Sequence, residues 1–150
     1  MVADDLVRMS QPELDDLFRR SQAGPIPVGP VDGTVLFDPG TELSEVAAKV
    51  AHLLFWKGKV FDPGTGTLKN EILPVGMKAI AADVYRAPSW FDGKECIVLD
   101  YSKTSVVAHW IRDEIRMTAP GLYLGLVFWD RDRILCFALT STAPPATSSD

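Results

Sequence analysis

Strand-length segments follow one another from residue 56 to residue 140, separated by short turns rich in glycine, proline and aspartate. Within each segment, alternating side-chain character and frequent β-branched or aromatic residues predict a β-strand. One further segment precedes them, so the predicted strands are 31–37, 56–61, 67–73, 77–86, 94–101, 113–118, 122–129 and 133–140. Because parallel neighbours need a crossover of about a dozen residues, connections this short predict antiparallel pairing.

The last two segments are apolar on both faces, which narrows the architecture further. Leu124 and Phe128 alternate with Tyr123 and Val127, so neither face has the polar residues of a solvent-exposed surface. An antiparallel strand with one face in water would alternate with polar residues instead. We therefore expect one face to meet a helix and the other to line a barrel, which at about eight strands encloses side chains or one small ligand.

Two helices are predicted before residue 56. Ser10 and Glu13 form a capping box at the start of a helix over about 11–20. A second helix, about 42–55, has apolar residues at i, i+3, i+4 and i+7 spacing. The predicted fold class is mainly β (α+β): an antiparallel barrel of about eight strands, with the N-terminal helix and the amphipathic helix packed on it. We expect a single domain over residues 1–142 and a disordered tail, 143–150.

Composition argues against several partners and cofactors. The formal net charge of −5 disfavours nucleic acid, which rewards a clustered basic surface. No apolar run reaches the roughly 20 residues of a membrane span and no signal peptide is evident, so we expect a cytoplasmic protein without a membrane span. Cys96 and Cys136 lie singly in apolar segments and are interpreted as buried thiols. Because no His or Cys pair has ligand spacing, no metal and no cofactor are expected.

Asp100 and Tyr101 end one predicted strand, where the mouth of a barrel is built. Adjacent strand residues point to opposite faces, so only one of the two can face inward. An inward Asp100 among apolar groups would have a raised pKa and could act as a general acid or base. Alternatively, Asp100 satisfies the backbone of a turn and Tyr101 lies on the rim.

Arg112, Glu114 and Arg116 share one face of another predicted strand, and Asp113 and Ile115 share the other. The charged row could be a solvated ladder of salt bridges. Alternatively, Arg112 enters the interior and holds an anionic head group as a bidentate partner. In that case Glu114 is a second candidate for proton transfer.

Trp56 and Lys59 follow the amphipathic helix directly. In a binding site, Trp56 would form an apolar wall and Lys59 would place a charge at the barrel mouth. The alternative is an edge strand protected from aggregation by its lysines.

Three stretches carry a resemblance to known proteins: 56–62 (WKGKVFD), 88–102 (PSWFDGKECIVLDYS), and 112–125, which contains RDEIR and APGLYLG. On these the chain resembles a group of small, functionally unassigned bacterial proteins over most of residues 11–140, and the resemblance supplies no activity. More loosely, the strand count and the preceding helix are similar to lipocalin-like (calycin) barrels, which carry apolar ligands. The Gly-x-Trp signature of lipocalins is absent from the first strand, which reads VDGTVLF over 31–37.

These features predict binding of a small, mostly hydrophobic molecule, with a carboxylate or other polar end, in the interior of a β-barrel. The predicted ligand-binding residues are Trp56, Lys59, Tyr101, Arg112 and Tyr123. One alternative is an enzyme of the isomerase, cyclase or hydratase type that uses Asp100 or Glu114 in the same interior. Another alternative is a protein-interaction module with an aromatic rim.

Overall fold

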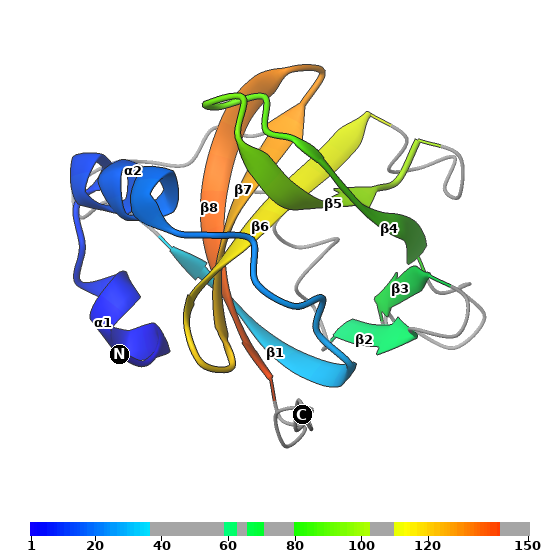
Figure 1. Cartoon of the computed structure of the whole chain (residues 1–150), viewed down its shortest axis with the longest axis horizontal. Coiled ribbons are helices and arrows are strands. Elements are labelled where there is room, and N and C mark those ends of the chain that lie inside the picture. Colours follow the sequence, from blue (N-terminus) through cyan, green and yellow to red (C-terminus); the bar gives the residue numbers. More distant parts are fainter. Residues whose placement is uncertain (37–58, 63–65, 71–79, 103–109, 142–150) are drawn as a thin grey trace.

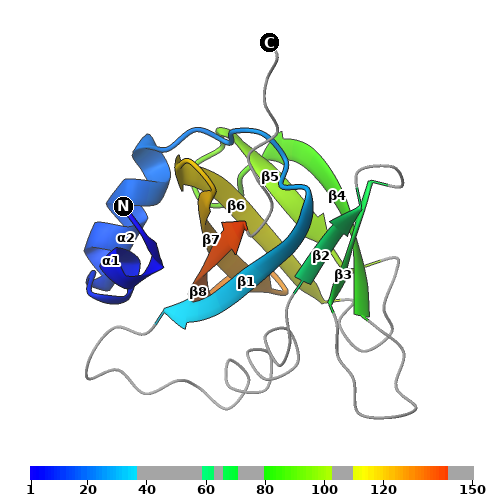
Figure 2. The ribbon, with the colours of Figure 1, turned by 90° about the horizontal axis from the view of Figure 1, so that it is seen from below.

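The computed structural model of the chain describes residues 1–36, 59–62, 66–70, 80–102 and 110–141. The strands in this part are β1 (Gly29–Leu36), β2 (Lys59–Asp62), β3 (Thr67–Asn70), β4 (Ile80–Pro88), β5 (Glu95–Asp100), β6 (Ile111–Ala119), β7 (Leu122–Trp129) and β8 (Asp132–Ser141). Each strand pairs antiparallel with the next, and β1 also pairs with β8, which closes the barrel (Figure 1). Seen from below, the strands surround a common interior (Figure 2). The predicted mainly β, antiparallel fold is confirmed.

The predicted strands correspond one to one with the observed ones, with shifted ends. The largest differences are that β2 begins at Lys59, β3 ends at Asn70 and β4 begins at Ile80. α2 (Gln11–Arg20) matches the predicted N-terminal helix, and its capping box is formed, with the Ser10 amide donating to Glu13 Oε1 at 3.0 Å. α1 (Ala3–Val7) was not predicted. The predicted helix 42–55 and the predicted tail 143–150 lie outside the described residues.

The barrel wall is buried on both faces along β5 to β8, which accounts for the apolar character of these strands on both sides. Leu99, Ile115 and Val127 belong to a cluster on the inner face. A second cluster on the outer face joins side chains of these strands to α1 and α2. Its members include Leu6, Leu14, Phe18, Cys96, Val98, Leu124 and Leu126. The helices therefore remove from water the outer face that the barrel itself leaves uncovered.

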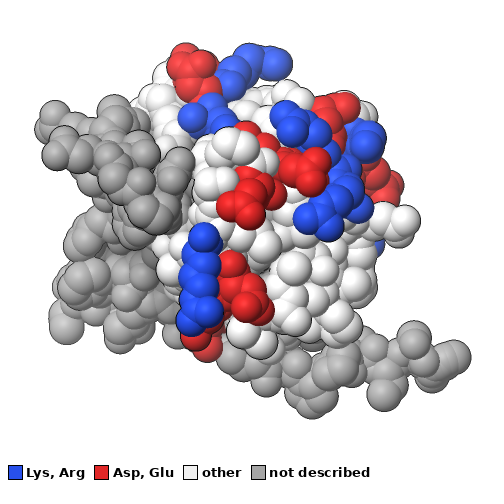
Figure 3. Space-filling model, turned by 90° about the vertical axis from the view of Figure 1, so that its left-hand side faces the viewer, with Lys and Arg blue, Asp and Glu red and all other residues white. Residues whose placement is uncertain are grey.

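Ion pairs hold the helical side of the molecule together, where positive and negative side chains lie next to one another (Figure 3). Arg133 of β8 forms an ion pair with Asp15 of α2, and Arg20 bonds Asp16 within the helix at 3.2 Å. The first of these contacts ties α2 to the barrel wall. The second is exposed and contributes little, since exposed pairs are worth at most about 1 kcal/mol.

Residues 21–28 form a strap that covers the barrel end where β6 turns into β7. The amide of Met117 donates to the carbonyls of Gln22 and Ala23 at 3.1 and 3.2 Å, and Ala23 is part of the inner cluster. Gly24 has φ +72°, and a β-carbon there would collide with Met117. This position therefore requires glycine for both backbone conformation and space.

Gly125→Ala should destabilise the barrel from inside. Gly125 pairs with Phe137 across β7 and β8, and a β-carbon at this position would overlap the Phe137 ring. Overpacking of this kind typically costs about 1–3 kcal/mol. Urea denaturation measures the change in the free energy of unfolding. In the double variant with Phe137→Leu, the loss should be smaller than the sum of the single losses; strict additivity would contradict the proposed overlap.

Candidate functional site

Strand register separates the candidate residues of β6 between the two faces of the wall. Glu114 is paired with Val98, which belongs to the outer cluster. Asp113 is paired with Leu99, which belongs to the inner cluster. Because directly paired residues share a face, Glu114 points away from the interior and Asp113 points into it. Arg112 and Arg116 alternate with Asp113 and therefore lie on the outer side with Glu114.

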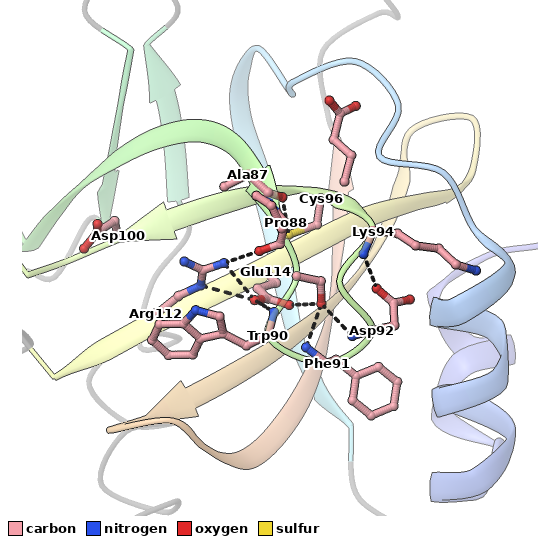
Figure 4. Close-up of polar contacts among 12 residues, drawn as sticks. Ala87, Pro88, Trp90, Phe91, Asp92, Lys94, Cys96, Asp100, Arg112 and Glu114 are labelled. Atoms are coloured by element: carbon pink, nitrogen blue, oxygen red, sulfur yellow. Dashed lines mark hydrogen bonds and ion pairs between the residues drawn. The ribbon is translucent and has the colours of Figure 1, made fainter.

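Glu114 is buried beneath the connection between β4 and β5 (Figure 4). Its carboxylate accepts hydrogen bonds from the Ser89 hydroxyl at 2.5 Å and the Trp90 amide at 2.7 Å. Nε and Nη2 of Arg112 donate to the same carboxylate at 3.2 and 3.0 Å, and Nη2 also donates to the Pro88 carbonyl. Every contact shapes the connection rather than the interior, so Glu114 acts here as a structural anchor.

Arg116 is 0% exposed and is surrounded by acceptors. Its guanidinium donates to both carboxylate oxygens of Asp92 at 2.6 and 2.7 Å. It also donates to the carbonyls of Phe18, Lys94 and Glu95 at 2.9, 3.0 and 3.1 Å. The bidentate bond from Arg116 lowers the pKa of Asp92 below its usual value, an effect larger than the opposing effect of burial.

Trp90, in the connection between β4 and β5, lies against the outer wall. Its ring meets Phe128 edge-on at 5.5 Å between centroids, and the guanidinium groups of Arg112 and Arg131 lie 4.3 and 4.6 Å from its centroid. The residue keeps 39% of its surface exposed. The charged row on β6 is thus neither a solvated ladder nor an inward clamp for an anion: both interpretations are corrected by its burial under this loop.

Asp100 also lies outside the barrel interior, opposite Arg112 on the outer face. Tyr85 Oη donates to its carboxylate at 2.8 Å, and the Ser102 amide donates at 2.9 Å. Burial raises the pKa of Asp100, but these hydrogen bonds outweigh burial and hold the pKa below its usual value. Burial and the bond to Asp100 raise the pKa of Tyr85 to about 12. Asp100 is therefore an ionised carboxylate that accepts hydrogen bonds at the end of β5. Like Glu114, it lies on the outer face of the wall and does not face the interior.

The two predicted tyrosines do reach the inner face. Tyr101 and Tyr123 are buried members of the inner cluster. Tyr123 Oη donates to the Pro25 carbonyl at 2.5 Å, so its hydroxyl fastens the strap, and burial raises its pKa. Lys59 belongs to β2 by its backbone, but its side chain and the whole of Trp56 lie outside the described residues.

Asp113 is the interior carboxylate that sequence reasoning missed. It is 0% exposed and is paired on its two sides with Leu99 and Val127, both of the inner cluster. Tyr101 lies one layer nearer the strand end, where its amide bonds the Ile111 carbonyl at 3.4 Å. Among the described charged residues that are buried, Asp113 alone faces inward, since Glu114 and Arg116 face outward. The signal in the sequence was the apolar character of its neighbours on the same strand face. Apolar neighbours indicate an inward face more reliably than the high density of charges on the other face of the strand.

Other chemistry was searched for in the described part of the chain. There, no group of three or more His, Cys, Asp and Glu side chains is placed to hold a metal ion. Cys96 and Cys136 are free and buried, as predicted, and burial raises the pKa of Cys96 to about 12. Over the same residues, no helix has the length and apolar character needed to cross a membrane.

Glu114→Ala should destabilise the protein strongly because it leaves the Arg112 guanidinium, the Ser89 hydroxyl and the Trp90 amide without their acceptor. Breaking a buried charged pair typically costs about 3–5 kcal/mol. The matched control is Glu95→Ala, which removes an exposed ion pair with Arg86 and should cost less than about 1 kcal/mol. Denaturant unfolding of both variants is the measurement, and equal losses would show that the outer network is not an anchor.

Asp92→Asn should flatten the acid limb of the stability profile. The folded-state pKa of Asp92 lies below the unfolded value of about 3.8, so its contribution is complete above that value and is lost as the pH falls through the folded-state pKa. Thermal melts of the wild type and the variant between pH 7 and pH 2 measure this. Relative to the wild type, the variant should be less stable at pH 7 and lose less stability below about pH 3.8. Parallel profiles would rule out the ion pair as a source of acid sensitivity.

Comparison with known proteins finds a similar fold and indicates no activity. The chain is similar to a crystal structure described as a protein from Thermomonospora curvata, with a TM-score of 0.59 and 17% sequence identity. The match covers 90% of this chain and 89% of that one. No family model matches the sequence, and no curated protein matches it. At this identity the likeness shows a shared architecture, so function has to be argued from the site itself.

Proposed function

We propose that the barrel binds a small, mostly hydrophobic molecule in its interior. The observation that carries the proposal is Asp113, a fully buried carboxylate that faces a cluster of apolar side chains on the inner wall. A carboxylate among apolar side chains on the inner wall gives a bound molecule a polar group to contact. Small-molecule sites combine apolar walls with a few placed polar groups.

The polar contacts proposed for the ligand are Asp113 and Tyr101, which both lie on the inner face of neighbouring strands. Arg112 was predicted as a ligand contact and is not proposed as one, because its guanidinium bonds Glu114 on the outer side of the wall. Tyr123 contributes apolar ring surface, while its hydroxyl holds the strap at Pro25. This mode of binding would resemble that of calycin barrels.

The strap fills one end of the barrel with Ala23 and Ile26, which pack against the inner cluster. Tyr101 and Ile111 lie at the strand ends remote from it, and Trp129 pairs with Ile111 there.

A cytoplasmic site of action is part of the proposal, and the two buried free thiols support it because reducing compartments keep cysteines unpaired.

The placement of Asp100 and Glu114 on the outer wall gives no support to an acid–base reaction that uses them in the interior. Asp113 is the carboxylate positioned to act on a bound molecule. Because a single inward carboxylate serves recognition as well as proton transfer, binding is the function that the geometry supports best.

Methyl NMR spectroscopy tests the proposal on the wild-type protein, with octan-1-ol, decan-1-ol and dodecan-1-ol as probes. Binding in the interior should shift the methyl signals of Leu99, Ile115 and Val127, which face inward. The methyl groups of Val98 and Leu124 serve as the internal control, because they lie on the outer face of the same strands. If none of the three alcohols shifts the inward signals, or if the outer signals respond equally, the proposal is overturned.

A further inference from the structure

We infer that residues 25–28 of the strap are a lid, which opens and closes over one end of the barrel while the barrel itself stays intact. The lid turns about Gly24 and Gly29, and the side chains of Tyr123 and Arg86 hold it shut. The inference goes beyond the proposed function and does not rest on it, because it concerns the closure of the barrel end and not what the interior binds.

The chain on both sides of the lid is fixed to the barrel. Before the lid, the amide of Met117 donates to the carbonyls of Gln22 and Ala23 at 3.1 and 3.2 Å. After the lid, β1 pairs with β2 from Gly29 and with β8 from Val31. Movement of the strap is therefore confined to the residues between these two anchors.

The backbone between the anchors combines two hinge positions with a stiff segment. Gly24 and Gly29 have φ angles of +72° and +73°, which glycine adopts readily because it has no β-carbon. Pro25 and Pro27 lie between them, and each proline ring fixes φ and removes an amide donor. Because hinges are a few residues that absorb a large change in backbone angles, residues 25–28 can move as one piece about the two glycines.

Few contacts hold this piece against the barrel. Within the part of the chain that the structure describes, no backbone hydrogen bond joins residues 25–28 to a strand. The closed lid is instead held by apolar contact, since Ile26 packs against the inner cluster and Pro27 is buried. A segment held in this way opens locally, at a lower free energy than unfolding of the whole domain.

Two side chains of the barrel bond the lid beside its first hinge and act as latches. Tyr123 of β7 donates through Oη to the Pro25 carbonyl at 2.5 Å, and Nη2 of Arg86 of β4 donates to the Gly24 carbonyl at 2.7 Å. Glu95 Oε2 lies 3.5 Å from Nη1 of Arg86 and orients the guanidinium. Tyr123 is 3% exposed and the Arg86 side chain is 39% exposed, so the tyrosine is the stronger latch.

Methyl relaxation dispersion of the Ile26 δ1 signal measures the opening, because it detects motions on the microsecond-to-millisecond timescale. Tyr123→Phe removes only the hydroxyl that bonds Pro25. The loss of one hydrogen bond of ordinary strength should raise the open population about fivefold. The inward methyl groups of Leu99 and Val127 should show no matching exchange, because the barrel wall stays closed.

The matched control is Tyr85→Phe, which also removes one phenol hydroxyl and its hydrogen bond, in this case to Asp100 on the outer face. It should leave the exchange at Ile26 as in the wild type. Arg86→Ala removes the more exposed latch and should raise the open population by a smaller factor. Circular dichroism shows whether each variant is folded, and Arg86→Ala decides alone if Tyr123→Phe is not.

The inference is supported if exchange at Ile26 increases in Tyr123→Phe and not in Tyr85→Phe. It is overturned if Ile26 shows no exchange in any variant, because the strap then stays closed. It is also overturned if Leu99 and Val127 exchange at the same rate as Ile26, because the barrel then opens as a whole, or if both tyrosine variants act equally. These measurements contain no ligand, so their outcome is independent of whether the alcohols bind in the interior.

Discussion

The buried guanidinium of Arg116 is the interaction on which the rest of the structure depends. From β6 it reaches the carbonyl of Phe18 at the end of α2, the carboxylate of Asp92 and the carbonyls of Lys94 and Glu95. One side chain therefore joins the helical cover, the loop between β4 and β5, and the barrel wall. A buried charge of this kind is tolerated only when every donor finds an acceptor, so these three parts of the molecule must be assembled together.

The loop between β4 and β5 covers the charged side chains on the outer face of β6, whereas the charged side chain on its inner face lies away from this loop. On the outer face, Arg112 donates to the Pro88 carbonyl and lies over the Trp90 ring, and Glu114 accepts a hydrogen bond from the Trp90 amide. These contacts make the wall stiff where the loop crosses it. Inside, Asp113 remains on a surface that is otherwise apolar. Strand alternation thus places a structural ion network and a candidate recognition group on adjacent residues, separated by the thickness of one strand.

Much of the fold could be predicted because it depends on local patterns. The capping box at Ser10 and the period-2 segments gave α2 and all the strands of the described part, and short turns gave antiparallel order. α1 was missed because five residues, Ala3–Val7, are too few to show a helical period. The site was predicted less well: Tyr101 and Tyr123 do face inward, whereas Asp100, Arg112 and Glu114 lie on the outer wall.

The sequence by itself determined the type and order of the elements, and which residues share a strand face, because these follow from backbone periodicity alone. It placed Arg112 and Glu114 on one side and Asp113 on the other. Only the tertiary structure decided which side is the interior, because both faces are buried and the apolar pattern no longer distinguishes them. The helices and the loop that carries Trp90 cover one face, and their docking depends on contacts distant in sequence, such as Arg116 with Phe18.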